Sequence, residues 1–308
     1  MTVRELRGRS RWLTVVVLAV AAVSVGCEPR SSFLPFGFGS GCSSMVSTAP
    51  MRIAYGDAAD TFGDLYLPAL HRGPLPVVVL VHGGAWSQNR ALDNAAPIAE
   101  SLVQRGVAVW NIEYRRVNGA GGWPVTLTDV AAAVDALTTV VQQRCGNRLD
   151  LNRVHLAGHS AGGHLAAWAA GRGALPPDAP GAHPRIRVRS VTVMAGVFDL
   201  ALAVTAGNDN AVPALLGGLP DQVPDRYHLA SPISHLPIGA HITAVHGDAD
   251  RVVSVDQSRR YTSAAAAAGD TADLRVLSGV GHADFLDTST PAWAVAQQAI
   301  LDNVNTFR

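Results

Sequence analysis

The pentapeptide Gly158-His159-Ser160-Ala161-Gly162 constrains the fold of this chain more than any other stretch. It follows the short apolar run 154–157 and precedes the alanine-rich run 163–170, so it lies between an expected strand and an expected helix. A Gly-x-Ser-x-Gly pattern in that context is typical of a sharp turn that exposes a nucleophilic serine. Glycine suits both ends of such a turn because a side chain there would collide with neighbouring backbone. Ser160 is therefore the candidate nucleophile.

Apolar runs that alternate with helical patterns surround this turn. The continuous run 76–81, rich in β-branched residues, is typical of a strand buried on both faces. Short alternating runs at 52–55 and 64–67 predict an antiparallel opening hairpin. Further strands are predicted at 107–112, 188–195, 242–245 and 274–277, and helices at 97–105, 127–144, 256–268 and 291–304. Strands alternating with helices predict an α/β fold with a mostly parallel central sheet flanked by helices.

Residues 200–239 interrupt this alternation with five prolines. The segment is too short for an independent domain. We expect it to form a small proline-rich cap insertion over the carboxyl edge of the sheet, where ligands bind in open α/β folds.

The first 26 residues have a basic head of four arginines followed by the apolar run 12–25, and they are interpreted as a signal peptide. The apolar run is shorter than the ~20 residues of a membrane-spanning helix. Residues 23–27 resemble the lipobox of bacterial lipoproteins, which implies a lipid on Cys27. We expect an exported protein, anchored to the outer face of the membrane or secreted. Residues 27–50 then form a flexible tether, and residues 51–308 form the catalytic domain.

The chain contains three cysteines. With Cys27 set aside, Cys42 and Cys145 remain, and in an oxidising compartment they form either a disulfide or two separate thiols. Their wide spacing does not indicate a zinc site.

The charge balance argues against nucleic acid as a partner. Twenty-four basic and 24 acidic residues give a formal net charge of zero, without the basic excess of a nucleic-acid-binding domain. Hydrophobic residues make up 48% of the chain and charged residues 16%, which is the composition of a folded domain.

The sequence His82-Gly83-Gly84-Ala85-Trp86 directly follows the run 76–81. Paired glycines allow backbone N–H groups to turn into a cavity, so Gly83 and Gly84 are candidate oxyanion donors together with Ala161, the residue after the candidate nucleophile. His82 is expected to pack under this loop. Trp86 either forms the floor of a substrate pocket or belongs to the core.

A serine nucleophile on this fold needs a histidine base and a carboxylate that orients it. His282 lies in a glycine-flanked loop after the last predicted strand and is the candidate base. Asp250 follows the strand 242–245 and is the candidate acid, with Asp248 and Asp199 as rivals. The chain order Ser160, Asp250, His282 agrees with a nucleophile-acid-base order known for this type of fold.

These stretches, with Tyr114-Arg115 and the segments 158–164 and 281–285, resemble α/β-hydrolase-fold serine esterases over residues 51–308. Within that fold they look like the bacterial carboxylesterase and kynurenine formamidase branch, which is related to the hormone-sensitive-lipase-like esterases. The resemblance implies hydrolysis of small-molecule carboxylic esters with short to medium acyl chains, without a metal or organic cofactor.

Three alternatives remain open. The same turn serves amide hydrolysis of the arylformamidase or peptidase type. A non-catalytic surface protein on a hydrolase scaffold would not need all three residues. A true lipase ordinarily has a larger apolar lid than residues 200–239 supply. The sequence does not indicate the oligomeric state.

Overall fold

The computed structural model describes residues 49–69, 73–207 and 209–306. The predicted signal peptide, the lipid on Cys27, most of the tether and Cys42 lie outside these residues. Cys145 is buried, and its Sγ contacts the carbonyl oxygen of Gln142 at 3.3 Å. Its pairing with Cys42 therefore stays a prediction. Among the described residues, no helix has the length and apolar character needed to cross a membrane.

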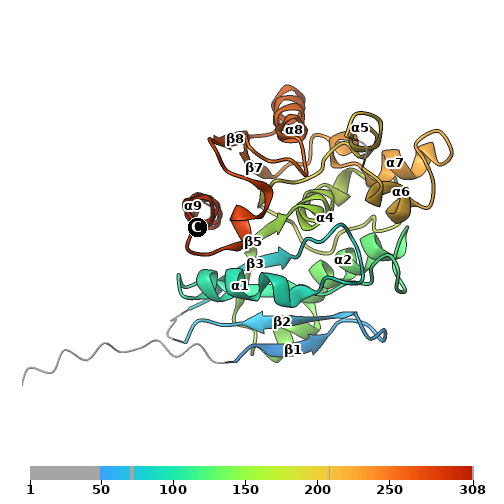
Figure 1. Ribbon diagram of the computed structural model, residues 1–308. Coiled ribbons are helices and arrows are strands. Elements are labelled where there is room, and N and C mark those ends of the chain that lie inside the picture. Colours follow the sequence, from blue (N-terminus) through green and yellow to red (C-terminus); the bar gives the residue numbers. More distant parts are fainter. Residues whose placement is uncertain (1–48, 70–72, 208, 307–308) are drawn as a thin grey trace, which may run out of the picture. The chain divides into compact units, whose positions relative to one another are not determined.

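Eight strands form one sheet, in the order β1-β2-β4-β3-β5-β6-β7-β8 (Figure 1). The β1–β2 pair is antiparallel, as the expected opening hairpin requires, the β2–β4 pair is antiparallel too, and every other pair is parallel. The predicted mostly parallel sheet is confirmed. The strands are β1 (Met51–Ala54), β2 (Phe62–Tyr66), β3 (Leu75–Val81), β4 (Ala108–Ile112), β5 (Leu149–His159), β6 (Ser190–Met194), β7 (His241–Gly247) and β8 (Ala272–Leu277).

Helices cover both faces of this sheet. In β3, alternate side chains point to opposite faces of the sheet, and both sets are apolar. Val77, Val79 and Val81 belong to one hydrophobic core, whereas Val78 and Leu80 belong to a second core on the opposite face. Both faces of β3 are buried, as its continuous apolar run predicts. The first core includes α2 (Val125–Asp135), α3 (Val140–Arg144), α4 (Ala161–Ala170) and α8 (Val255–Ala268), and the second includes α1 (Ala96–Val103) and α9 (Pro291–Thr306).

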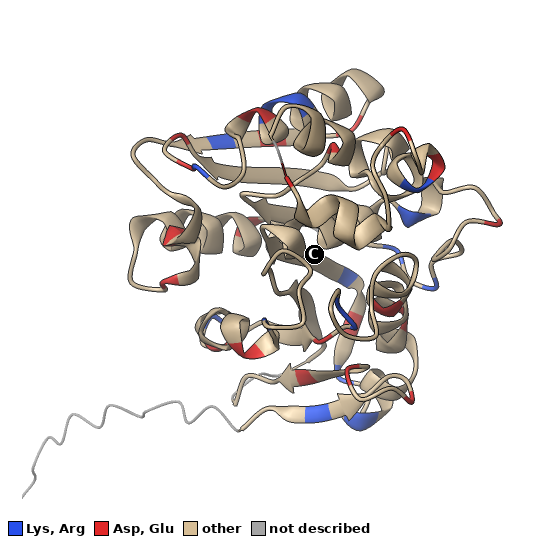
Figure 2. Ribbon diagram, turned by 45° about the vertical axis from the view of Figure 1, so that its right-hand side comes forward, with Lys and Arg blue, Asp and Glu red and all other residues tan. Residues whose placement is uncertain are grey.

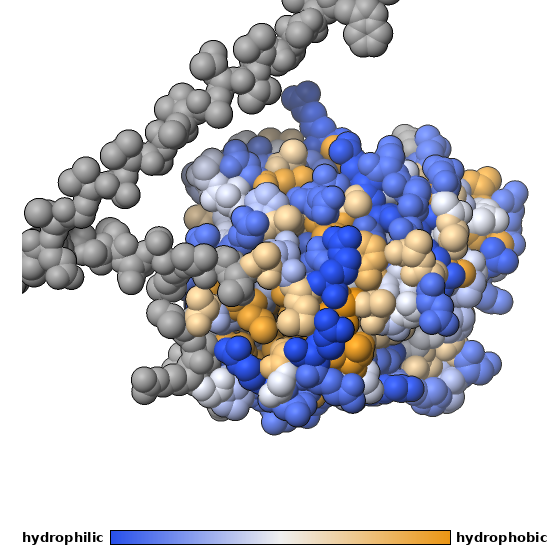
Figure 3. Space-filling model, turned by 90° about the horizontal axis from the view of Figure 1, so that it is seen from below, coloured by the Kyte–Doolittle hydropathy of each residue, from blue (hydrophilic) through white to orange (hydrophobic). Residues whose placement is uncertain are grey.

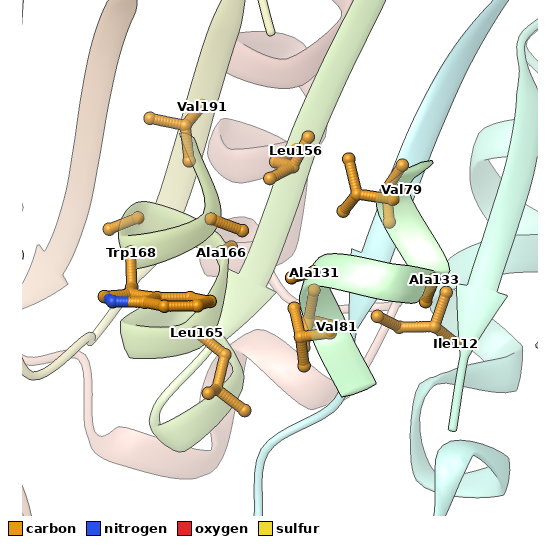
Figure 4. Packing of buried hydrophobic residues seen from close by; sticks show 14 of the residues in the cluster. Val79, Val81, Ile112, Ala131, Ala133, Leu156, Leu165, Ala166, Trp168 and Val191 are labelled. Carbon is orange, nitrogen blue, oxygen red and sulfur yellow. The ribbon is translucent and has the colours of Figure 1, made fainter. Parts of the chain in front are cut away.

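Small side chains let the helices of the first core lie close to the sheet. Figure 4 shows Ala131 and Ala133 of α2 facing Val81 and Ile112. Each alanine adds little volume, so the strand side chains fill the space between the two layers at the density of a protein interior. Leu165 and Ala166 of α4 belong to the same core, so this packing also holds α4 and the turn that precedes it.

The helix predicted over 127–144 is interrupted in the structure. A 3-10 turn, η2 (Ala136–Thr138), separates α2 from α3, and Thr139 leaves the helical region with φ −130° and ψ −106°. The hydroxyl of Thr138 donates to the carbonyl oxygen of Asp135 at 2.8 Å. Threonine hydroxyls compete in this way for backbone groups of a helix, and a periodic apolar pattern does not reveal the competition.

The proline-rich segment 200–239 is an insertion between β6 and β7. It contains α5 (Leu200–Thr205), α6 (Ala211–Leu216), α7 (Pro224–Ala230) and η4 (Pro232–His235). Two side chains of α4 hold it: the indole of Trp168 donates to the carbonyl oxygen of Leu229 at 2.9 Å, and Nε2 of His164 donates to that of Ala230 at 2.9 Å. The insertion is therefore hydrogen-bonded to the helix that follows the turn at Ser160.

Charged residues of both signs are interspersed over the described elements (Figure 2). On the face shown in Figure 3, apolar residues reach the surface in patches bordered by hydrophilic residues. Apolar atoms normally contribute more than half of a folded protein's surface, so such patches do not by themselves indicate a partner.

Candidate active site

The turn at Ser160 joins β5 directly to α4. Ser160 has φ 56° and ψ −124°, a strained conformation for a residue with a side chain. A Cβ atom added at Gly158 would lie 2.2 Å from the carbonyl oxygen of Gly162, and one added at Gly162 would lie 2.1 Å from that of Val81. Only glycine fits at these two positions, so the backbone can turn sharply enough to raise the serine above the sheet.

Ser160, His282 and Asp250 form a hydrogen-bonded chain. The Oγ of Ser160 lies 2.9 Å from Nε2 of His282, and Nδ1 of His282 lies 2.7 Å from Oδ2 of Asp250. Asp250 follows β7, and His282 begins η5 (His282–Leu286) after β8. The three residues come from loops at the carboxyl ends of parallel strands, where ligands bind in open α/β sheets.

The carboxylate of Asp250 is held from several sides. Its Oδ1 accepts hydrogen bonds from the backbone N–H groups of Val252 and Val253 at 2.8 and 2.9 Å, and Nε2 of His246 lies 3.3 Å from its Oδ2. Burial raises the pKa of Asp250, but the hydrogen bonds from His246, His282 and the two amides outweigh burial and hold the pKa well below its ordinary value. Asp250 therefore stays ionised beside His282.

The two rival carboxylates have other partners. Asp248 accepts a hydrogen bond from the backbone N–H of Gly279 at 2.7 Å and so ties the β7 and β8 loops together. Asp199 caps α5 by accepting from the N–H of Leu202 at 2.9 Å. Of the three candidate acids, Asp250 is hydrogen-bonded to His282.

Gly83 and Gly84 lie beside Ser160 in the loop after β3. A Cβ atom on Gly83 would lie 3.3 Å from Cβ of Ser160, and Gly84 has a φ of 118°, which favours glycine. Ala161 is the first residue of α4, and amides of a first helical turn have no partner within their helix. Gly83 and Gly84 line the space in front of Ser160, and Ala161 directly follows that serine in the chain. Their role as oxyanion donors stays a prediction.

A buried ionic network that the sequence analysis did not identify supports this loop. The Nε2 of His82 lies 2.8 Å from Glu113, and its Nδ1 lies 2.9 Å from the carbonyl oxygen of Gly83. Glu113 also pairs with Arg116, and the hydroxyl of Tyr114 donates to the carbonyl oxygen of His82 at 2.8 Å. Burial raises the pKa of Glu113, but hydrogen bonds from His82, Tyr114 and Arg116 more than offset it, so the pKa is lowered. His82 thus connects a buried carboxylate to the glycine loop.

Trp86 does not form the floor of the pocket. Only 2% of its surface is exposed, and its indole donates to Nδ1 of His164 at 3.1 Å. The sequence left a choice between pocket and core, and the structure places Trp86 in the core. Its polar N–H is satisfied by a histidine on α4, a partner that only the folded chain brings near.

His159 contacts His282 from the residue before the nucleophile. Its Nε2 donates to the carbonyl oxygen of His282 at 2.8 Å, and the two ring centroids are 4.6 Å apart. Burial, with a smaller contribution from the neighbouring His282, lowers the pKa of His159 to about 4. His159 is therefore neutral at pH 7 and positions the backbone of the candidate base.

Two other serine–histidine pairs are enclosed by the fold. The Nδ1 of His155 lies 2.7 Å from Oγ of Ser190, and that of His246 lies 2.7 Å from Oγ of Ser258. All four residues are buried, and none lines the pocket in front of Ser160. A substrate can therefore reach Ser160 but neither of these two serines.

A pocket of about 740 Å³ opens in front of Ser160 and His282. None of its described lining residues comes from 200–239, so the insertion contributes nothing to the wall of this pocket. A cap over the carboxyl edge of the sheet stays a prediction. Among the described residues, no group of three histidine, cysteine or acidic side chains is arranged to hold a metal ion. The apolar part of the wall is formed by Leu80, Val81, Ala85, Ala95, Ile98, Met194, Val252 and Leu286.

Buried histidines predict a loss of stability in mild acid. Burial lowers the pKa of His155 to about 3, and the pKa values of His159 and His164 to about 4, from an ordinary value of 6.5. Between about pH 6.5 and pH 4 the unfolded chain binds these protons and the native chain does not, so the free energy of unfolding decreases as the pH falls through this window. Urea unfolding midpoints at pH 7.5, 6.5, 5.5 and 4.5 measure the effect. A midpoint independent of pH would contradict it.

Known proteins resemble this chain over half of its length or more. The chain is 29% identical over 259 residues to Esterase LipC of Mycobacterium tuberculosis, which covers 80% of this chain and 63% of that protein. It is 29% identical over 155 residues to Kynurenine formamidase of Danio rerio, and this alignment covers 50% of this chain and 48% of that protein. The chain thus spans between about half and just under two thirds of the length of these curated relatives.

A solved structure shows the fold. A truncated carbohydrate esterase from gut microbiota superposes with a TM-score of 0.73 at 23% identity, over 85% of this chain and 99% of that one. This similarity confirms the α/β-hydrolase fold. A model of the family BD-FAE matches residues 63–264, well over half of the chain. The chain therefore belongs to the BD-FAE family.

Proposed function

We propose that this protein is a serine hydrolase that cleaves carboxylic esters through an acyl-enzyme intermediate. The observation that carries the proposal is the hydrogen-bonded chain Asp250–His282–Ser160, which ends at the wall of an open pocket. The names of relatives such as Esterase LipC and Esterase LipQ of Mycobacterium tuberculosis support it.

In the proposed mechanism, Oγ of Ser160 attacks the ester carbonyl carbon while its proton passes to Nε2 of His282. The backbone N–H of Ala161 and that of Gly83 or Gly84 stabilise the negative oxygen that forms. His282 then donates its proton to the leaving alcohol. Water, deprotonated by His282, attacks the acyl-enzyme and releases the carboxylic acid and free Ser160.

Asp250 sets the tautomer of His282. Because its carboxylate accepts from Nδ1, that nitrogen carries the hydrogen and Nε2 is free to accept the serine proton. The ionised carboxylate then stabilises the imidazolium that forms during each transfer.

Short to medium acyl chains are the proposed substrates. Each buried CH₂ contributes about 0.8 kcal/mol, but only while an apolar wall covers it. In this pocket of about 740 Å³, the apolar wall is formed by side chains outside the insertion. We therefore expect kcat/KM for p-nitrophenyl acetate and butyrate to exceed that for palmitate by at least about tenfold. Equal or higher activity on palmitate emulsions would instead indicate a lipase.

An amide hydrolase is the second candidate function, because a kynurenine formamidase is among the relatives. The same serine, base and amide donors serve both reactions. N-formylkynurenine and aminoacyl anilides, assayed beside the p-nitrophenyl esters, separate the two. A kcat/KM higher on an amide than on every ester would replace the ester proposal. Inertness of the folded protein toward both classes would favour a surface binding protein.

A further inference from the structure

Arg90 stands at the rim of the pocket, beside the glycine loop. Its stem covers Gly84, because a Cβ atom added there would lie 2.4 Å from both Cβ and Cγ of Arg90. Its backbone is held at both ends: its N–H donates to the carbonyl oxygen of Ser87 at 3.1 Å, and its own carbonyl oxygen accepts from Arg116 at 2.7 Å. The backbone of Arg90 is therefore anchored in the loop that borders the pocket.

The pocket carries a positive charge without a matching carboxylate. Among the described lining residues, Arg90 is the one lysine, arginine or acidic side chain. Neighbouring arginines are paired, Arg116 with Asp60 and Glu113 and Arg115 with Asp129, whereas no described carboxylate lies within ion-pair distance of Arg90. The carboxylate of Asp250 is enclosed behind His282 and does not line the pocket.

Hydrogen-bonding side chains share the rim with Arg90. The polar residues Ser87, Asn89 and Asn94 line the pocket and lie close to Arg90 in the sequence. Ile98, Met194 and Leu286 contribute apolar side chains to its wall. A guanidinium that shares a pocket with hydroxyl and amide side chains matches a carboxylate, which accepts several hydrogen bonds.

On these observations, and on the proposed esterase function, we propose that the pocket selects esters that carry an anionic group, with Arg90 as its recognition residue. The apolar wall takes the hydrocarbon part of such a substrate, and the rim takes its carboxylate. Arg90 is exposed, so its contribution is screened by solvent and salt.

The test compares esters that differ in one carboxylate. On the acyl side, the p-nitrophenyl monoester of adipate is compared with p-nitrophenyl hexanoate, and on the alcohol side 4-carboxyphenyl acetate is compared with phenyl acetate. The readout is the ratio of kcat/KM for the anionic ester to that for the neutral ester, after subtraction of spontaneous hydrolysis. A general loss of activity in a variant affects both esters equally and therefore leaves this ratio unchanged.

We expect Arg90→Gln to lower this ratio about fivefold in at least one of the two pairs, and Arg90→Glu to lower it further. Sodium chloride at 0.5 M should reduce the wild-type ratio toward that of Arg90→Gln. The control is Arg105→Gln, which removes the same charge from an exposed position outside the pocket and should keep the wild-type ratio.

A ratio that is the same in wild type, Arg90→Gln and Arg90→Glu for both pairs overturns the anion subsite. If the neutral esters are still cleaved in a Ser160-dependent way, the proposed function survives that result. Failure of the folded wild type to cleave any of the four esters overturns both proposals.

Discussion

Ser160→Ala is expected to lower kcat/KM for p-nitrophenyl butyrate by about 10⁴-fold, which corresponds to about 5 kcal/mol of transition-state stabilisation. The reason is geometric. Oγ of Ser160 is the atom hydrogen-bonded to His282, and alanine leaves the base and the amide donors without a nucleophile. The measurement is steady-state hydrolysis at pH 7.5, with circular dichroism to verify that the variant is folded.

Ser190→Ala is the matched control. This serine also lies 2.7 Å from a histidine nitrogen, on His155, but both residues are buried away from the pocket. We expect it to retain ester hydrolysis and to lose about 1–2 kcal/mol of stability, because a buried histidine nitrogen loses its partner. A large loss of kcat/KM in Ser190→Ala, with activity kept in Ser160→Ala, would contradict the assignment of the nucleophile.

Glu113→Gln is expected to lower the free energy of unfolding by about 3 kcal/mol. The carboxylate is buried, and it pairs with Arg116 and with His82, both of which are buried too. Removal of its charge leaves the guanidinium with Asp60 alone among the described carboxylates. Urea unfolding at pH 7.5 measures the change, and kcat for a short ester shows whether the glycine loop moves when its support is weakened.

The Asp256–Arg259 pair provides the comparison for that experiment. These two side chains are 63% and 53% exposed and lie 3.0 Å apart on α8, so Asp256→Asn should cost less than about 1 kcal/mol. If Glu113→Gln and Asp256→Asn lower the free energy of unfolding equally, the network under the glycine loop stabilises the protein no more than an exposed ion pair does.

The strands, the order of the helices and the turn at Ser160 were predictable from the sequence because local rules govern them. Apolar runs of β-branched residues show which strands are buried on both faces, and the structure confirms this for β3. Glycine at 158 and 162 is required by contacts within a few residues or with the adjacent strand. The break between α2 and α3 was missed because it depends on threonine hydroxyls, which leave the apolar period unchanged.

The sequence by itself determined the α/β architecture, because periodicity and glycine sterics act over short distances. It also supplied the candidate nucleophile, base and acid. Only the tertiary structure decided which side chains that are about 30 to 120 residues apart in the sequence contact each other. It placed Trp86 in the core against His164, and Glu113 beneath His82. It also left Arg90 at the rim of the pocket. Burial and charge pairing set these contacts, and both depend on how distant strands end at the same edge of the sheet.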